Sequence, residues 1–276
     1  MAWFDSFRGR VVVVTGASSG IGRATAVAFG AAGARVALVA RRRVLLEAVA
    51  VEARAAGAAA AMPVATDVTD RAAVAACFEA IERELGCPDV VVNNAGILIP
   101  SPVAELAAAD LEAMLRVNLF GALFVMQEAL RRMRARGDGC IVNVASLGGR
   151  RGISPIGGYC ATKFALVGLT EALRTELVDE PVHVALVEPG VVDTPMVEGV
   201  SHDDEFLAIW PTMLNMPPSW VVWAVFAAAR FRLREISVPP GAATLEKLAA
   251  LAPGVGDAIV QWAQRASHWL AARRPR

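Results

Sequence analysis

The chain has 276 residues, of which 55% are hydrophobic and 20% are charged, and its 27 basic and 27 acidic residues leave a formal net charge of zero. This length and apolar content are enough for one large domain with its own hydrophobic core, and they exclude an intrinsically disordered chain. The balanced charge gives no electrostatic footprint for binding nucleic acid, so no nucleic-acid partner is expected.

Short valine-rich runs recur along the chain and predict the strands of a parallel sheet. Strands of this kind are apolar throughout because helices cover both faces of the sheet. About seven strands are expected. The strong candidates are residues 11–14, 36–40, 90–92, 140–144 and 182–187, and the weaker ones are residues 61–66 and 235–239.

The segments between these runs carry apolar residues at three- and four-residue spacing, which is typical of helices that pack on a sheet. The clearest cover residues 44–57, 111–137 and 164–177, and two of the three end in glycine. Strand and helix alternate without a break in composition. The pattern therefore predicts an α/β fold with a doubly wound parallel sheet, helices on both faces and ligands at the carboxyl ends of the strands.

A glycine-rich turn follows the first strand, where "TGASSGIG" places Gly16, Gly20 and Gly22 between a strand and a helix. Glycines at this point allow a tight turn and let a pyrophosphate approach the first amides of the helix, whose dipole favours anions. A turn without any ligand is the alternative for an isolated match. The strand before it and the helix after it favour a dinucleotide site.

Three arginines, "RRR", follow the second strand at residues 41–43. An acidic residue near this strand end usually binds the ribose 2′-hydroxyl of NAD, whereas an arginine pairs with the 2′-phosphate of NADP. The acid is missing here. We therefore expect Arg41 to bind the phosphate, with Arg42 or Ser18 as a further candidate, and we interpret Arg43 as a solvated start of the next helix.

The only tyrosine in the chain, Tyr159, stands four residues before Lys163, one of only two lysines, in "YCATK". In a helix, residues four apart share one face, so both side chains reach the same cleft. A phenol titrates near 10, and a cation a few ångströms away is expected to lower that pKa and make the phenol a usable acid. The structural alternative is a helix tyrosine beside a lysine that extends to solvent.

These motifs together resemble the short-chain dehydrogenase/reductase family: "TGASSGIG", "NNAG", a serine at the end of the fifth strand and "YCATK" stand in the family's order over residues 8 to 200. The resemblance implies a Rossmann fold in a single domain. Residues 1–241 would form the catalytic domain and residues 242–276 a C-terminal helical extension of it.

The resemblance implies Asn118, Ser146, Tyr159 and Lys163 as catalytic residues. Ser146 would polarise a substrate carbonyl and Asn118 would hold a water that relays protons from Lys163, although a turn serine and an asparagine that caps or kinks its helix are the alternatives. Asp67 would accept a hydrogen bond from the adenine, and Asn93 would brace the sheet. The implied cofactor-binding residues are Gly16, Ser18, Ser19, Gly20, Ile21, Gly22, Arg41, Arg42, Asp67, Val68, Asn94, Ala95, Gly96, Tyr159, Lys163, Pro189, Gly190, Val192 and Thr194.

The expected function is an NADP(H)-dependent oxidoreductase that interconverts a ketone or aldehyde and an alcohol, with Tyr159 as general acid and base. The alternatives are an NAD-linked alcohol dehydrogenase working oxidatively, and a non-catalytic NADP(H) sensor or scaffold of the same fold. The identity of the substrate is not predicted, because the family pattern ends at residue 200 and the region after it usually selects the substrate. Six residues predict either an apolar pocket wall for a lipophilic substrate or ordinary core packing: Met196, Trp210, Met213, Met216, Trp220 and Trp223.

Four cysteines and three histidines lie scattered without metal-ligand spacing, so we expect reduced thiols and no metal site. The N-terminus lacks the apolar core of a signal peptide, and the apolar run at residues 220–229 falls short of the roughly 20 residues that span a bilayer. We therefore expect a cytoplasmic protein.

Two further expectations concern assembly. In the family, helices like those at residues 110–136 and 158–178 pair between subunits, which implies a homodimer or homotetramer. The C-terminal segment places Val255, Ile259, Trp262, Ala266 and Trp269 on one face of a helix, with packing against a subunit favoured over peripheral contact with a membrane.

Overall fold

A computed structural model describes residues 4–198, 216–251 and 254 of the chain. Its centre is a seven-stranded parallel sheet with the strand order β3-β2-β1-β4-β5-β6-β7. This confirms the predicted α/β fold with seven strands. The strands are β1 Val11–Thr15, β2 Arg35–Ala40, β3 Ala60–Ala65, β4 Val90–Asn93, β5 Gly139–Val144, β6 Val182–Pro189 and β7 Glu235–Val238.

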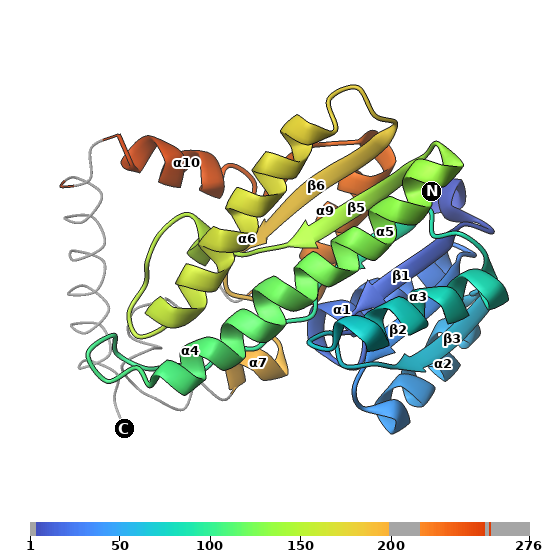
Figure 1. Ribbon diagram of the computed structural model, residues 1–276, viewed down its shortest axis with the longest axis horizontal. Helices are drawn as coiled ribbons and strands as arrows, with labels where there is room; N and C mark the ends of the chain where they lie inside the picture. The colour runs from blue at the N-terminus through green and yellow to red at the C-terminus, as the bar shows by residue number, and fades with distance from the viewer. Residues whose placement is uncertain (1–3, 199–215, 252–253, 255–276) are drawn as a thin grey trace, which may run out of the picture.

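Helices cover both faces of this sheet (Figure 1). Successive residues of β1 alternate between the two helical layers. The helices α1 (Gly20–Ala31), α2 (Arg43–Ala56) and α9 (Pro218–Phe231) pack on one face, where Val12 and Val14 of β1 point. The helices α3 (Arg71–Leu85), α5 (Ala122–Arg136) and α6 (Gly157–Glu176) pack on the other face, against Val11 and Val13. Burial on both faces explains why the strands are apolar at every position.

The chain reverses its winding between β1 and β4, which are neighbours in the sheet although β2 and β3 come between them in the sequence. Loops that leave these two strands must turn in opposite directions, and they open a crevice at the carboxyl ends of the strands. The glycine-rich turn after β1 and the "NNAG" segment after β4 lie at this crevice. The fold therefore brings the predicted motifs to one edge of the sheet.

The predicted helix at residues 110–136 is interrupted. The structure has α4 (Ala108–Leu115), a π-helical segment η2 (Arg116–Gly121) and then α5. Each π turn carries one more residue than an α turn, so backbone groups are freed for other partners. The amide of Asn93 uses one of them, donating to the carbonyl oxygen of Ala122 at 2.9 Å.

Shorter elements complete the described chain: 3-10 turns η1 (Phe4–Phe7) and η3 (Leu147–Gly149), and helices α7 (Pro195–Glu198) and α10 (Ala242–Ala249). The amphipathic segment at residues 255–269 and the residues Trp210 and Met213 lie outside the described residues. A boundary between residues 241 and 242 stays a prediction. Within the described ranges no helix has the length and apolarity needed to cross a membrane, and no group of three metal-ligating side chains occurs.

Candidate active site

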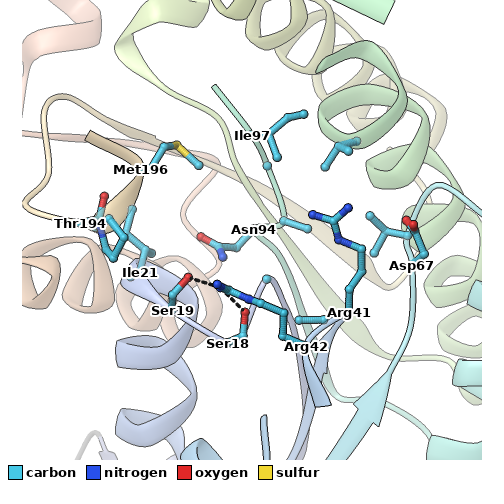
Figure 2. Close-up of a pocket in the computed structure, with 18 of the residues that line it drawn as sticks. Ser18, Ser19, Ile21, Arg41, Arg42, Asp67, Asn94, Ile97, Thr194 and Met196 are labelled. Atoms are coloured by element: carbon cyan, nitrogen blue, oxygen red, sulfur yellow. Dashed lines mark hydrogen bonds between the residues drawn. The ribbon is translucent and has the colours of Figure 1, made fainter. Parts of the chain in front are cut away.

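A cleft runs along the carboxyl ends of the strands and has two adjoining hollows of about 340 and 110 Å³. The larger hollow collects the glycine turn, the arginines after β2 and the "NNAG" segment, as Figure 2 shows. The smaller one collects Ser146, Tyr159, Lys163 and the Pro189–Gly190 segment. The hollows form one continuous site, because both are lined by Ile21, Asn94, Gly96, Thr194 and Met196.

The glycine-rich turn uses each of its glycines differently. Gly16 and Gly20 have φ angles of +67° and +54°, which side-chain-bearing residues rarely adopt, and both line the cleft. A Cβ on Gly22 would lie 2.3 Å from the carbonyl oxygen of Gly16, so the first turn of α1 packs directly on the loop. Gly22 thus shapes the site from behind and does not line it.

Thr15, the last residue of β1, ties the two loops of the crevice together. Its hydroxyl accepts hydrogen bonds from the backbone N–H groups of Asn94 at 2.9 Å and Ala95 at 3.0 Å, and Asn94 Nδ2 donates to the Thr15 carbonyl oxygen at 3.0 Å. The sequence analysis missed this residue. The threonine that precedes the first glycine of the turn was the available signal, since a hydroxyl there can serve the next loop.

The two arginines at the carboxyl end of β2 play different parts (Figure 2). Arg42 donates through Nη2 to the hydroxyl oxygens of Ser18 at 3.0 Å and Ser19 at 3.1 Å, so its guanidinium is fixed over the glycine turn. Arg41 points into the cleft beside Asp67. Arg43 lies outside the lining and pairs with Glu47 on the surface, as expected.

Asp67 lies beyond β3 and accepts hydrogen bonds from the backbone N–H and the hydroxyl of Thr69, both at 2.9 Å. The pKa of this carboxyl is lowered by the backbone bond from Thr69, with a further contribution from the positive charge of Arg41. The carboxylate is therefore charged at neutral pH and held in one orientation. Val68 lines the cleft beside it.

Ser146, Tyr159 and Lys163 meet in the smaller hollow. The Ser146 hydroxyl accepts from the N–H of Gly148 at 3.0 Å and is hydrogen-bonded to the Tyr159 phenol. Lys163 donates through Nζ to the carbonyl oxygen of Val144 at 3.0 Å, and Nζ lies 5.6 Å from the centre of the Tyr159 ring. The i, i+4 spacing on α6 thus brings both side chains to one site, as predicted.

Burial sets the electrostatics of this group. It raises the pKa of Tyr159 to about 12, although the hydrogen bond with Ser146 acts in the opposite direction. It also lowers the pKa of Lys163 to about 8, since a buried ammonium loses its hydration. The expected lowering of the phenol pKa by Lys163 is therefore not seen in this structure, because desolvation of the buried phenolate is the largest cause and raises the pKa.

Asn118, the fourth predicted catalytic residue, is buried behind the cleft and does not line it. Its Oδ1 accepts from the N–H of Ile97 at 2.8 Å, and its Nδ2 donates to the Ile97 carbonyl oxygen and to the Thr162 hydroxyl. The asparagine lies in the π-helical segment. Its role in holding a water stays a prediction.

The other predicted cofactor-binding residues after β6 line the cleft, and so do several residues that were not predicted. Pro189, Gly190, Val192 and Thr194 line the smaller hollow together with Met196. Met216 is buried in the core, and Trp220 and Trp223 are half exposed on α9, so these three do not form a pocket wall. The cleft also includes residues that the sequence analysis did not name as site residues, which are Ala40, Thr66, Ile97, Leu98, Val117, Val144, Ala145, Leu147, Gly148, Ile153, Ile156, Val191 and Pro195.

Comparison with known proteins identifies the family. The family model described as short chain dehydrogenase matches residues 10–205. The chain belongs to the short-chain dehydrogenase family. The predicted resemblance is thereby confirmed, and the strand order and cleft described above are those of a short-chain dehydrogenase with an intact Tyr159–Lys163 pair.

The names of individual relatives describe enzymes that act on alcohols or ketones. Sorbitol dehydrogenase of Cereibacter sphaeroides is 38% identical over 70% of this chain and 74% of its own length. Levodione reductase of Leifsonia aquatica is 39% identical over 70% of this chain and 73% of its own. A short-chain dehydrogenase/reductase from Burkholderia phymatum, solved in complex with NAD, superposes with a TM-score of 0.79 at 27% identity and covers 91% of this chain and 96% of its own. This short-chain dehydrogenase is accordingly an oxidoreductase of alcohol and carbonyl groups.

Proposed function

We propose that this oxidoreductase uses NADPH to reduce a ketone or aldehyde to an alcohol, and that its substrate is lipophilic. The observation that carries the cofactor assignment is the pair Arg41 and Arg42 at the carboxyl end of β2, where an NAD enzyme needs an acid. Arg42 is fixed by Ser18 and Ser19, and Arg41 is aimed into the cleft. A 2′-phosphate would meet two guanidinium groups and two hydroxyls there.

The donor set of the cleft fits a dinucleotide. The positive φ angles of Gly16 and Gly20 expose backbone at the start of α1, where an anionic pyrophosphate is favoured. Asp67 offers a fixed carboxylate acceptor for an adenine amino group, and Lys163 offers an amine beside the catalytic hollow. When bound, the nicotinamide supplies the hydride.

The residues of this chain supply the proton. A phenol with a pKa near 12 is protonated at neutral pH, so Tyr159 is in the form that donates to the oxygen of a carbonyl as charge develops on it. Ser146 supplies a second hydroxyl to the same oxygen. Lys163 has a pKa near 8 and can restore the proton to Tyr159 at little cost in free energy.

The walls of the smaller hollow support the lipophilic substrate. Leu98, Leu147, Ile153, Ile156 and Met196 line it around the serine and the tyrosine. A polyol such as sorbitol carries several hydroxyls, and each one buried against these side chains without a partner costs about 1–3 kcal/mol. A compact apolar ketone loses nothing of this kind. The hollow therefore favours a ring or short-chain ketone over a sugar alcohol.

The experiment is a matched substrate panel. Purified protein is assayed with NADPH and NADH against a panel of ketones and aldehydes that includes cyclohexanone, and in the reverse direction with NADP+ and NAD+ against cyclohexanol and sorbitol. We expect kcat/KM for NADPH to exceed that for NADH by at least tenfold, and cyclohexanol to exceed sorbitol by a similar factor. A preference for NAD+ over NADP+ with cyclohexanol would support the NAD-linked alternative, and NADPH binding without turnover of any carbonyl in the panel would support a sensor.

We also propose a homodimer or homotetramer built on α5 and α6. The two helices lie side by side over one face of the sheet (Figure 1) and enclose a surface groove lined by Leu123, Leu130, Leu169 and Leu173. Phe164 and Leu169 are exposed on α6 along the same helix. Apolar side chains gathered on a helix pair are typical of an interface.

A further inference from the structure

A cluster of charged side chains lies beneath the catalytic hollow and outside its lining. Its centre is Arg150, whose side chain is only 11% exposed and whose three nitrogens each donate to a different carboxylate. Nε donates to Glu188 Oε1 at 2.6 Å, Nη1 to Glu171 Oε1 at 2.9 Å and Nη2 to Glu235 Oε2 at 3.2 Å. These carboxylates come from β6, α6 and β7, so one guanidinium joins three elements.

Both ends of the Arg150–Glu188 pair are attached to walls of the active site. Arg150 closes the short turn that begins at Ser146, and its N–H donates to the Leu147 carbonyl oxygen at 2.9 Å. Glu188 immediately precedes the Pro189–Gly190 segment that lines the opposite wall. The serine turn and the Pro-Gly segment are thus tied together from below by one ion pair.

The two walls also touch directly. A Cβ on Gly190 would lie 3.3 Å from Leu147 Cδ1, and the N–H of Gly190 donates to Val238 of β7 at 2.8 Å. A shift of either loop by a fraction of an ångström therefore changes the distance between Ser146 and the opposite wall. The hydrogen bond from Arg150 to Glu188 fixes the distance and the direction between the two groups, whereas apolar contacts alone allow the two loops to slide past each other.

Stability alone does not account for this pair. Glu188 is fully buried, and its Oε2 has no hydrogen-bond donor among the described residues. Burying charges has a desolvation cost that their attraction often fails to exceed, and apolar replacements of such pairs are frequently neutral or stabilising. What the ion pair adds is orientation.

We propose that Arg150 and Glu188 are positioning residues for the reaction, which hold the Ser146 turn and the Pro189–Gly190 segment at a fixed separation. The inference rests on the proposed carbonyl reduction. It assigns no contact with substrate to either residue, and both act through the loops that they join.

Glu188 also carries a titrating proton, and its carboxyl shares the guanidinium of Arg150 with the carboxyl of Glu235. Burial raises the pKa of Glu188 to about 7, partly offset by Arg150, and the neighbouring Glu235 raises it further. The pKa of Glu235 is lowered, because Lys247 and Arg150 outweigh its own burial. Below about pH 7 Glu188 therefore keeps its proton and accepts from Arg150 as a neutral carboxyl, and above this pH the two side chains form an ion pair. The charged groups around this carboxyl among the described residues are Arg150, Glu171, Arg174, Glu235 and Lys247.

The sign of the resulting pH dependence follows from linkage. In the unfolded chain the Glu188 carboxyl loses its proton near 4.5, whereas in the folded protein it keeps the proton to about 7. The folded state binds more protons between these values, so folding stability falls as the pH rises through that window. Glutamine at this position keeps the shape and cannot ionise, so Glu188→Gln removes that fall.

The experiment compares Arg150→Lys and Glu188→Gln with two controls, Arg83→Lys and Glu84→Gln, which alter an exposed ion pair on α3. We measure kcat and KM separately with cyclohexanone, or with whichever carbonyl the panel identifies, from pH 5 to 9, together with the Kd for NADPH. We expect Arg150→Lys to lower kcat about tenfold with little change in the Kd. We expect Glu188→Gln to remove an ionisation near pH 7 from the kcat profile, and both controls to match the wild type.

A kcat for Arg150→Lys within twofold of the wild type, at a temperature well below its melting point, would overturn the positioning role. Persistence of the same ionisation in Glu188→Gln would overturn the assignment of the proton. Failure of the proposed function can be told apart from failure of this inference, because a wild type that reduces no carbonyl refutes the proposed function alone. The proton assignment is then judged by melting temperatures, where the wild type should lose stability relative to Glu188→Gln between pH 5 and pH 8, and equal behaviour would contradict it.

Discussion

Lys163, in the proposed catalytic pair with Tyr159, lowers the stability of the folded protein. Lys163 is buried among apolar side chains, and its pKa falls from 10.5 to about 8. That difference corresponds to about 3 kcal/mol at neutral pH. The lysine therefore lowers the stability of the protein that it serves.

Replacing Lys163 with methionine tests this conclusion. Below pH 8 the buried amine is charged and costs stability, whereas between pH 8 and 10.5 the folded protein releases its proton before the unfolded chain does, and the cost disappears. Lys163→Met should therefore melt above the wild type at pH 7, by a margin that shrinks towards pH 10, while turnover is lost. Calorimetry across this range decides, and a margin that does not change with pH would contradict the predicted ionisation.

Tyr159→Phe isolates the proton donor. The phenyl ring fills the same buried space and loses only the hydroxyl that is bonded to Ser146. Because general acid catalysis commonly contributes about 100-fold or more, kcat should fall by at least that factor. Titration with NADPH should give the wild-type Kd. Turnover close to that of the wild type would remove Tyr159 from the mechanism.

The three consecutive arginines offer an internal control for cofactor choice. Arg41→Ala and Arg42→Ala each remove a guanidinium from the cleft, and each should weaken NADPH binding by about 1.5–3 kcal/mol, the size of a hydrogen bond between charged groups. Arg43 pairs with Glu47 on the surface, so Arg43→Ala should bind NADPH as the wild type does. Isothermal titration with NADPH and NADH measures all three. Equal losses for both cofactors would place the phosphate contact elsewhere.

Functional residues that belong to a short motif could be predicted from the sequence. Residues whose partners are distant along the chain could not. Tyr159 and Lys163 are four residues apart, and helix geometry alone brings them together. Arg150 and Glu188 are separated by 38 residues and meet only because β5 and β6 are neighbours. No local pattern marks such a pair. Burial likewise decided the pKa of Tyr159, and burial is a property of the fold.

Among the elements, the π-helical segment is the feature that amphipathic spacing could not predict. Apolar residues recur regularly through residues 111–137, because a single extra residue shifts the pattern by less than the width of the apolar face. The segment has two hydrogen-bond partners outside the helix: Asn118 bonds to the Ile97 loop, and the Ala122 carbonyl oxygen accepts from Asn93 of β4. Tertiary hydrogen bonds therefore set the local geometry.

Gly121 is the last residue of this segment, and it allows the segment to approach Val68 closely at the wall of the cleft. A Cβ there would lie 2.8 Å from Val68 Cγ2 and 3.2 Å from the Val68 carbonyl oxygen. Gly121→Ala should lower stability by about 1–3 kcal/mol through this crowding, and it should weaken cofactor binding because Val68 lines the cleft.

Gly168→Ala is the matched control for this prediction. Gly168 lies inside α6, where a Cβ would meet nothing within 4 Å, so alanine should be neutral or stabilising by about 0.5–1 kcal/mol. Chemical denaturation of the two variants compares them. If Gly121→Ala proves as stable as Gly168→Ala, the segment is free to move away from Val68.

For the whole molecule, the order of strands and helices could be predicted because each strand is apolar throughout and each is followed by a helix-period segment. The parallel sheet then leaves few topologies, and the motifs fall at the crevice without further assumption. The substrate wall could not be predicted in the same way. Trp220 and Trp223 follow the apolar pattern of a buried helix and yet lie half exposed on α9.

The proposed subunit interface on α5 and α6 can be tested at Leu169. Leu169 stands on the outer side of α6 at the groove shared with α5, and it is exposed in a single chain. A glutamate at this position would carry an unpaired charge into the contact if two copies pack there, a cost of several kcal/mol for each subunit. Leu169→Glu should therefore shift the protein to a lower mass in sedimentation velocity without altering the melting of the isolated subunit core.

Val51 on α2 provides the control, because it is 61% exposed on the opposite face of the sheet. Val51→Glu adds the same charge at a comparable exposed position and should sediment as the wild type does. A wild type that is monomeric at micromolar concentration, or a Leu169→Glu variant of unchanged mass, would refute assembly through α5 and α6.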